Sequence, residues 1–213
     1  MSSVTKWANV AVAMQSVIAA AKTITAVTQA SPAVASSVAH GFTNGDYVLI
    51  AAQGMTQIDK RVFRVANVAA DTFELEGIDS TSFDAFTSGD AKEITLGTSL
   101  TTLTSVSGSG GDFDFIDTTT IHDSIKTQIP GTANALTYEF ESIWDVADTG
   151  LIALKLASDN QEERAFLFTF PNGQKMVFNG FVGASLVPGG NAQDKVTTSV
   201  TITAFGTPTY LAT

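Results

Sequence analysis

The sequence has 213 residues, of which 44% are hydrophobic, and such a chain buries a substantial core in one large or two small domains. It contains no cysteine, which excludes disulfides, thiolate metal sites and thiol nucleophiles. Eleven Lys and Arg stand against 21 Asp and Glu, and the resulting net charge of -10 argues against a surface that grips nucleic-acid phosphates.

Targeting and membrane segments are not indicated. No apolar run approaches the roughly 20 residues of a membrane-spanning helix. The opening MSSVTKWANV lacks the basic start and apolar stretch of a signal peptide, so we expect synthesis in the cytoplasm.

The segment up to residue 23 carries two competing patterns. Trp7, Met14 and Ile18 recur at helical spacing, whereas Val10, Val12 and Met14 also alternate as in a strand. Periodicity alone favours a helix here.

Residues 24–92 consist of short β-branched and aromatic runs separated by turns. Asn44-Gly45-Asp46 supplies the left-handed position that a tight hairpin requires. About six short strands at this spacing predict a small β-barrel.

The Ser/Thr/Gly-rich residues 99–111 predict either a polar strand or a flexible connection, with a loop at its end. The following DFDFIDTTTIHDSIKTQIPG predicts a strand, a long hairpin loop and a second strand. This passage is longer than a tight hairpin needs, and it carries much aliphatic surface for a loop in water. The aliphatic residues are Ile116, Ile121, Ile125 and Ile129. Contact with a partner explains them, and so does packing on the chain's own sheet.

One helix is predicted from Asp145 to about Ser158. Asp145 is placed to cap its first turn, and Asp148 adds negative charge near the N-terminus. Leu151, Ile152 and Leu154 lie on overlapping faces.

The stretch RAFLFTFPNGQKMVFNG predicts a β-hairpin. Phe166, Phe168 and Phe170 share one strand face, and Pro171, Asn172 and Gly173 form a three-residue turn. In that register Phe166 faces Phe178 and Phe168 faces Met176, so the apolar face continues across both strands.

The last predicted strand, KVTTSVTITAFG, separates two kinds of side chain. One face holds Val196, Val200, Ile202 and Ala204, and the other holds Thr197, Ser199, Thr201 and Thr203. The hydroxyl face is an ordinary solvent face in a monomer.

Catalytic chemistry is poorly supported. His40 lies in a turn and His122 in a Thr/Asp-rich loop, where histidine is usually a polar surface residue. Asp112, Asp114, Asp117 and Asp123 form the densest acidic cluster, but the first two alternate with Phe along a strand, unlike a compact calcium loop. We therefore predict no catalytic residue, no cofactor site and no metal site.

The order of features over about residues 110–210 resembles the major tail tube proteins of long, noncontractile-tailed (siphovirus-type) bacteriophages. The resemblance rests on the helix, the F-P-N-G hairpin, the F-x-G-x-V strand and the Thr/Val-rich strand that ends near Gly206-Thr207-Pro208. DFIDTTTIHDSIKTQIPG looks like the long hairpin loop of that family. Residues 24–92 resemble a small β-barrel insert of phage structural proteins, which is similar to a half-domain of ubiquitin-activating enzymes. VAHGFTNGDYV and FRVANVAADTFEL carry this second similarity.

The resemblance implies a mainly β fold, namely a tail-tube-type β-sandwich or half-barrel with one α-helix and an inserted small β-barrel. The body would comprise residues 1–23 and 93–213, and residues 24–92 would form the insert on the outer surface. The family also implies an early strand where periodicity favours a helix, and we follow the family.

The implied function is that of a structural virion protein. Hexameric rings would stack around a conduit for the tape-measure protein and for DNA, which would pass without specific binding. Other implied partners are the tail terminator and tail tip proteins, and no membrane is involved. The hydroxyl face would line the lumen or lie against a neighbour. Contacts between subunits and rings are expected at Ile116, Asp117, Thr118, Ile121, His122, Ile125, Lys126 and Ile129.

Two other classes of function stay open. An all-β phage or cell-surface adhesin would use the insert to recognise a glycan or host receptor, and would remain a monomer or trimer. An enzyme would need a pair of carboxylates converging in a pocket.

Overall fold

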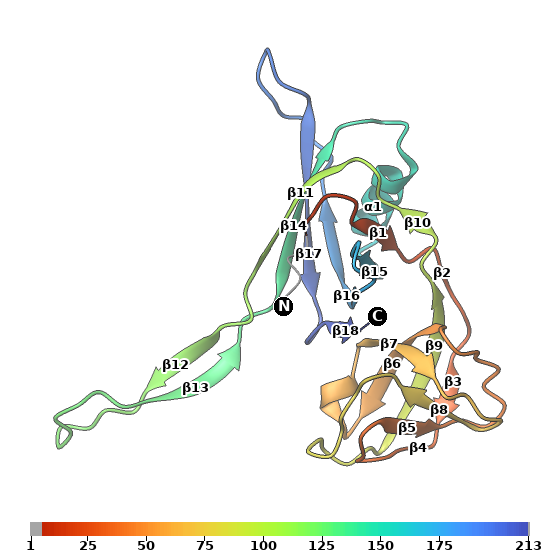
Figure 1. Ribbon diagram of the computed structural model, residues 1–213. Coiled ribbons are helices and arrows are strands. Elements are labelled where there is room, and N and C mark those ends of the chain that lie inside the picture. Colours follow the sequence, from red (N-terminus) through yellow and green to blue (C-terminus); the bar gives the residue numbers. More distant parts are fainter. Residues whose placement is uncertain (1–5, 213) are drawn as a thin grey trace.

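The computed structural model describes residues 6–212, so the first five residues of the predicted body and Thr213 lie outside the described residues. Two antiparallel β-structures lie one above the other, and a long hairpin projects from the upper one (Figure 1). The fold is mainly β with one α-helix in the described part of the chain, as the sequence predicted.

The upper structure, here called the body, is a sheet with strand order β10-β1-β15-β16-β17-β14-β11, in which β18 also pairs with β16. The helix α1 (Thr149–Asp159) packs against it. The strands are β1 (Ala11–Met14), β10 (Thr98–Ser99), β11 (Leu103–Ser109), β14 (Thr137–Ile143), β15 (Glu163–Thr169), β16 (Lys175–Ala184), β17 (Thr197–Ala204) and β18 (Thr209–Leu211).

The hairpin of β15 and β16 has the predicted register. Phe166 pairs with Phe178 and Phe168 with Met176, and the turn residue Gly173 has φ +87°. Glycine adopts this left-handed conformation at no steric cost, which is why Pro-Asn-Gly closes the turn.

The phenylalanine face of this hairpin forms the centre of the body core. The rings of Phe166 and Phe168 lie 5.5 and 5.9 Å from that of Phe178, and all three side chains are buried. Leu151 and Leu154 of α1 pack on the same cluster, so the body core lies between the sheet and the helix.

The lower structure, here called the barrel, has the strand order β2-β9-β6-β7-β8-β5-β4, and β3 also pairs with β9. Its strands are β2 (Val17–Ile18), β3 (Lys22–Ile24), β4 (Ala26–Val27), β5 (Ala33–Ser36), β6 (Tyr47–Gln53), β7 (Val62–Ala66), β8 (Thr72–Leu75) and β9 (Ser88–Thr95), and the 3-10 helix η1 (Thr56–Ile58) follows β6. Only Thr25 separates β3, which pairs with β9, from β4, which pairs with β5. The continuous segment of β3 and β4 therefore links the two ends of the ladder and closes it into the predicted small barrel.

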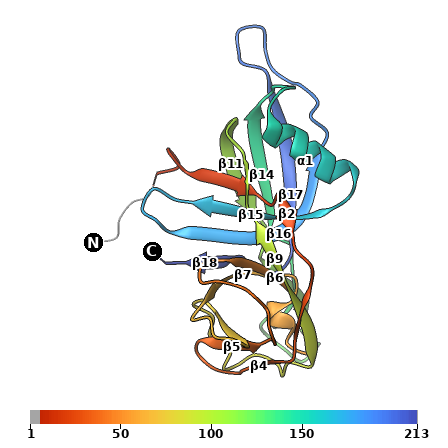
Figure 2. The same ribbon diagram turned by 90° about the vertical axis from the view of Figure 1, so that its right-hand side faces the viewer.

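The barrel has a core of its own. Phe63, Phe73 and Ile50 are among its fully buried side chains, and they belong to a cluster separate from the body core. Figure 2, a quarter turn away, again places the barrel below the body.

The two structures meet across a small apolar interface. Val62 and Ile94 of the barrel cluster with Ala165 and Val177 of the body, and all four are buried. The β15–β16 hairpin thus buries both of its faces. Its phenylalanine face lies in the body core, and its other face lies against the barrel.

The helical periodicity of the N-terminal segment is misleading, because residues 11–14 form strand β1. Val12 pairs with Phe168 and Met14 with Phe166, so this strand extends the sheet beyond the phenylalanine hairpin. Both side chains are buried in the body core. Tertiary pairing overrides the local pattern here, and the strand expected from the resemblance is confirmed.

The predicted helix starts three residues too early. Asp148, and not Asp145, is the N-cap, and its carboxylate accepts a hydrogen bond of 2.8 Å from the amide of Leu151. The carboxylate of Asp145 instead accepts a hydrogen bond of 2.9 Å from the amide of Ala147. This bond forms a local turn that precedes the helix. The helix ends at Asp159, one residue beyond the predicted end.

Candidate functional site

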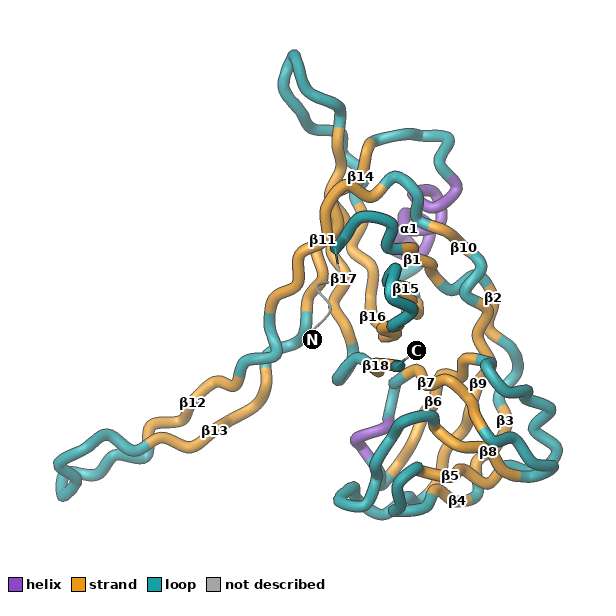
Figure 3. The backbone as a smooth tube through the Cα atoms, viewed as in Figure 1, coloured by secondary structure: helices purple, strands orange, loops and turns teal. Residues whose placement is uncertain are grey.

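The projecting hairpin, here called the arm (residues 112–133), consists of β12 (Phe113–Asp117), β13 (Gln128–Ala133) and the loop between them (Figure 3). This is the predicted order of strand, long loop and strand. Among the described residues, β12 and β13 pair only with each other. The arm therefore extends from the body without support from another strand.

The aliphatic side chains of the arm are not covered by the chain itself. Ile121 is 96% exposed and Ile125 is 78% exposed, and Ile116 and Ile129 are also exposed. Packing on the chain's own sheet therefore does not explain them. An exposed apolar cluster of this kind is typical of an interaction surface.

The tip of the arm is organised by its own polar groups. Asp123 accepts hydrogen bonds of 2.8 and 2.9 Å from the amide and hydroxyl of Thr120, and these bonds lower the pKa of its carboxyl group. The hydroxyl and amide of Thr119 likewise lower the pKa of the Asp117 carboxyl group. Thr118 donates from its amide to the carbonyl of Thr127 at 2.9 Å. The tip thus has a defined shape that presents its isoleucines outward.

A second surface lies on the outward face of β11, β14 and β17. Thr198, Val200, Ile202 and Ala204 are buried, whereas Ser199, Thr201 and Thr203 are exposed, as the alternation in the sequence predicts. Val196 does not follow the prediction, because it precedes β17 and is exposed.

This hydroxyl face contains carboxylates from the neighbouring strand. Glu139 lies between Ser107 and Thr201, and Glu141 lies between Ser105 and Ser199. A shallow groove of about 370 Å³ runs over these residues. The groove is lined by hydroxyls, the two carboxylates and a few uncharged residues, and no lysine or arginine in its lining attracts a phosphate.

A third surface is the groove beside α1. It has a volume of about 390 Å³, and Trp144, Val146, Ile152, Leu156 and Leu186 provide its apolar lining. The indole N–H of Trp144 donates to the carbonyl oxygen of Leu186 at 3.0 Å, which fixes one wall. We call this feature the α1 groove.

The α1 groove was not anticipated from the sequence. The sequence pattern places Leu151, Ile152 and Leu154 on overlapping faces of the helix, but only Leu151 and Leu154 are buried. The signal was present, because Ile152 and Leu156 are one helical turn apart on a side that does not contain Leu151 or Leu154. A helix with apolar side chains on two sides buries them fully only if another element or another molecule packs against each side.

The two histidines lie in different parts of the chain, His40 in the barrel and His122 on the arm. His40 is buried, contrary to the surface position expected, and its ring bonds to the carbonyl of Ala69 and the amide of Phe42. His122 lies at the exposed tip of the arm. No three acidic or histidine side chains among residues 6–212 are grouped so as to hold a metal ion. Across the same residues, no helix is both long and apolar enough to cross a membrane.

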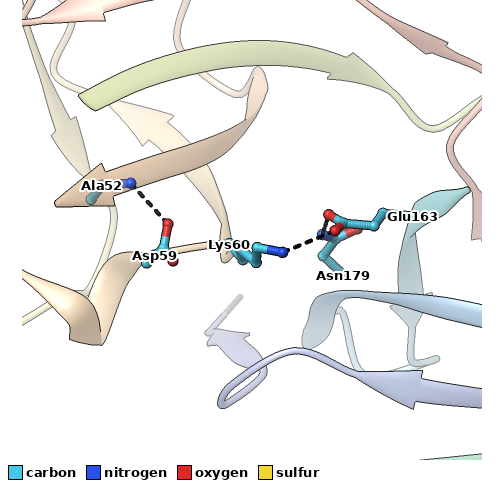
Figure 4. A network of polar contacts seen from close by, with 5 residues as sticks. All are labelled: Ala52, Asp59, Lys60, Glu163 and Asn179. Atoms are coloured by element: carbon cyan, nitrogen blue, oxygen red, sulfur yellow. Dashed lines mark hydrogen bonds and ion pairs between the residues drawn. The ribbon is translucent and has the colours of Figure 1, made fainter.

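A polar network joins the barrel to the body next to their apolar interface (Figure 4). The ammonium of Lys60 donates to Glu163 at 3.1 Å, and the amide of Asn179 donates to the other carboxylate oxygen at 3.2 Å. Nearby, Asp59 accepts from the amide of Ala52 at 2.9 Å and holds the turn that carries Lys60. These contacts are structural and involve no reactive group.

Comparison with known proteins gives one family. The model of the phage tail tube protein family matches residues 53–213, a range that includes the arm, α1, the hydroxyl face and half of the barrel. No curated protein matches the chain.

Proposed function

Since the chain belongs to the phage tail tube protein family, it is a structural, non-enzymatic subunit of a virion tail tube, and we propose that its copies close into hexameric rings. Stacked rings would enclose a conduit for the tape-measure protein and later for DNA, in a noncontractile tail of the siphovirus type. The tail terminator and tail tip proteins would contact the two ends of the stack. Synthesis would take place in the cytoplasm of the host bacterium.

The hydroxyl face carries this proposal, because it has the chemistry that a conduit for DNA requires. Its serines, threonines and two glutamates hold water and repel phosphate, so a passing polyanion finds no site at which to bind. We place this face toward the lumen. The edge strand β11 pairs only with β14, so its other edge is free to continue the sheet into a neighbouring subunit.

The arm would make the contacts between subunits and rings. Burial of its exposed isoleucines would contribute about 25 cal/mol per Å² of apolar surface. Ile116, Ile121, Ile125 and Ile129 would supply this surface, and Asp117, Thr118, His122 and Lys126 would supply its polar rim.

Residues 24–92, which form most of the barrel although its sheet also includes β2, the start of β3 and the end of β9, would be an inserted domain on the outside of the tube. Lys22 pairs with Ala91 and Thr23 with Asp90, so the chain enters and leaves the barrel at adjacent positions, as inserted domains normally do. The barrel and the hydroxyl face belong to different sheets, which favours a barrel outside the lumen. Its similarity to a half-domain of ubiquitin-activating enzymes stays a prediction.

Electron microscopy of the purified protein, combined with sedimentation analysis, tests the proposal. Rings with six subunits, or tubes built from them, are the expected result. A stable monomer or trimer at all concentrations would contradict it and would favour the adhesin, in which the barrel recognises a glycan or host receptor.

A further inference from the structure

The α1 groove is an apolar surface that the chain leaves open. Ile152 and Leu156 are 51% and 57% exposed, and Val146 beside them is exposed as well. One wall of the groove is held in place, because a hydrogen bond joins Trp144 to Leu186. An ordered apolar groove of this kind is typical of a surface that another polypeptide covers.

The arm lies at one end of strand β14, and residues that line the α1 groove lie at the other end. The arm leads into β14 just before Thr137, and Ile143 at the other end of β14 is followed by Trp144 and Val146. A strand of this length spans roughly 20 Å. In Figure 1 the arm points to the lower left, whereas α1 lies at the upper right. The arm therefore points away from the groove of its own chain.

The two surfaces are complementary. The arm tip presents Ile121 and Ile125, and the groove offers an apolar lining of matching chemistry. Lys126 at the tip has no carboxylate partner among the described residues. The groove lining also contains Lys155, which forms an ion pair with Asp159, and Asp145, which has no lysine or arginine partner among the described residues and can take that role.

On these grounds we propose that the α1 groove receives the arm tip of a second copy of this chain. Ile121 and Ile125 fill the groove, and Lys126 pairs with Asp145. Donor and acceptor surfaces differ, so the contact is heterologous and each bound copy still offers a free arm at one end and a free groove at the other. Such a contact closes a ring where its rotation closes and propagates a stack where it does not. The inference rests on the proposed tube function and names the surface that the arm occupies.

A charged substitution in the groove tests the contact without touching the arm. Leu156→Glu places a carboxylate where the isoleucines would be buried, and we expect the critical concentration for polymerisation to rise at least about tenfold. The matched control is Val38→Glu, because Val38 is an exposed valine on the barrel. Both variants should melt at the temperature of the unmodified chain. Tubes from Leu156→Glu at the concentration that suffices for Val38→Glu would overturn the groove assignment.

Cysteine cross-linking tests the same contact by proximity, since the chain has no cysteine of its own. Ile121→Cys and Ile152→Cys, combined in one chain, should give a ladder of covalent oligomers when assembled tubes meet a mild oxidant. Mixing the two single variants should give heterodimers only. The pair Ile121→Cys and Val38→Cys serves as the control and should stay monomeric on a denaturing gel.

The outcomes separate the groove from the tube function. Tubes that form without the 121–152 cross-link would overturn the groove assignment and leave the tube function intact. Failure of the unmodified chain to form rings or tubes would overturn the proposed function, and with it the groove.

Discussion

Lys60 in the barrel lies 3.1 Å from Glu163 in the body, and its ammonium also lies 4.5 Å from the centre of the Phe205 ring. These contacts flank the apolar cluster around Val62 and Val177. The barrel is therefore joined to the body by a packed interface as well as by the two chain crossings.

The apolar part of this interface should dominate its stability. The side chains of Lys60 and Glu163 are 48% and 31% exposed, so Lys60→Ala should cost less than about 1 kcal/mol. Val177→Asp should cost several kcal/mol, because it leaves an unpaired carboxylate in a buried apolar site. Urea unfolding of both variants measures the difference. A larger loss from Lys60→Ala than from Val177→Asp would show that the ion pair holds the interface.

The phenylalanine face should be essential to the body. Phe168 is fully buried and its ring contacts those of Phe140 and Phe178, so Phe168→Ala should cost about 3–5 kcal/mol. Phe115→Ala on the arm removes the same side chain from an exposed position and should leave the melting temperature unchanged. Equal melting temperatures for the two variants would contradict the assignment of the core.

The sequence predicted those parts of the fold whose signals are local. Pro171, Asn172 and Gly173 determine the turn, and the turn length sets the register that brings Phe166 opposite Phe178. Likewise, the alternation in β17 identified its buried face from Val200 onward. These features depend on neighbours along the chain, so a pattern suffices to find them.

Features that depend on distant partners were not predictable in the same way. β1 is a strand because β15 and β10 pair with it, and the helical spacing of its residues carries no information about either partner. The start of α1 was predicted three residues too early for a different reason. Asp145 and Asp148 both have side chains suited to an N-cap, and only the backbone conformation shows which of them caps the helix. The spacing of Ile152 and Leu156 marks a second apolar side of α1, but whether another element covers that side depends on the fold and not on the local pattern.

Ionisation of Tyr138 should lower the free energy of unfolding at high pH. Burial raises the pKa of its hydroxyl from 10.0 to about 12, so in this interval the folded chain holds a proton that the unfolded chain has lost. The stability linked to Tyr138 is therefore complete below pH 10 and is lost as the pH rises toward 12.

Tyr138→Phe isolates this effect. The variant keeps the ring that stacks on Phe178 at 4.4 Å and loses only a hydroxyl whose partner is the Met176 sulfur at 3.8 Å. It should match the unmodified chain at pH 7 and exceed it by on the order of 1 kcal/mol at pH 11. Urea unfolding at the two pH values measures this, and an equal difference at both would show that the hydroxyl does not titrate as described.

Removal of the barrel should leave a body that still assembles. A short Gly/Ser linker in place of residues 25–91 joins positions that are close, because Lys22 pairs with Ala91. The deletion uncovers Leu167 and Val177, so both should be changed to Thr to keep the body soluble. Electron microscopy should then show tubes that are thinner in projection. A folded body that forms no tubes would mean that the barrel takes part in assembly.

Ile121 and Ile125 should be needed for assembly and not for folding. Both lie at the tip of the arm and are mostly exposed, so changing them together to Ser removes little packing within the chain. The double variant should therefore keep its melting temperature, remain soluble as a monomer and fail to polymerise. Val38→Ser, at an exposed position on the barrel, is the control and should form normal tubes.

The melting temperature and the polymer content of the double variant answer separate questions. A lowered melting temperature would mean that the isoleucines pack on their own chain, contrary to their exposure. Normal tubes with an unchanged melting temperature would mean that the arm tip is not an assembly contact. Loss of tubes at an unchanged melting temperature is the expected result. Side chains that are exposed in the monomer and buried in the tube stabilise the assembly and not the fold of the single chain.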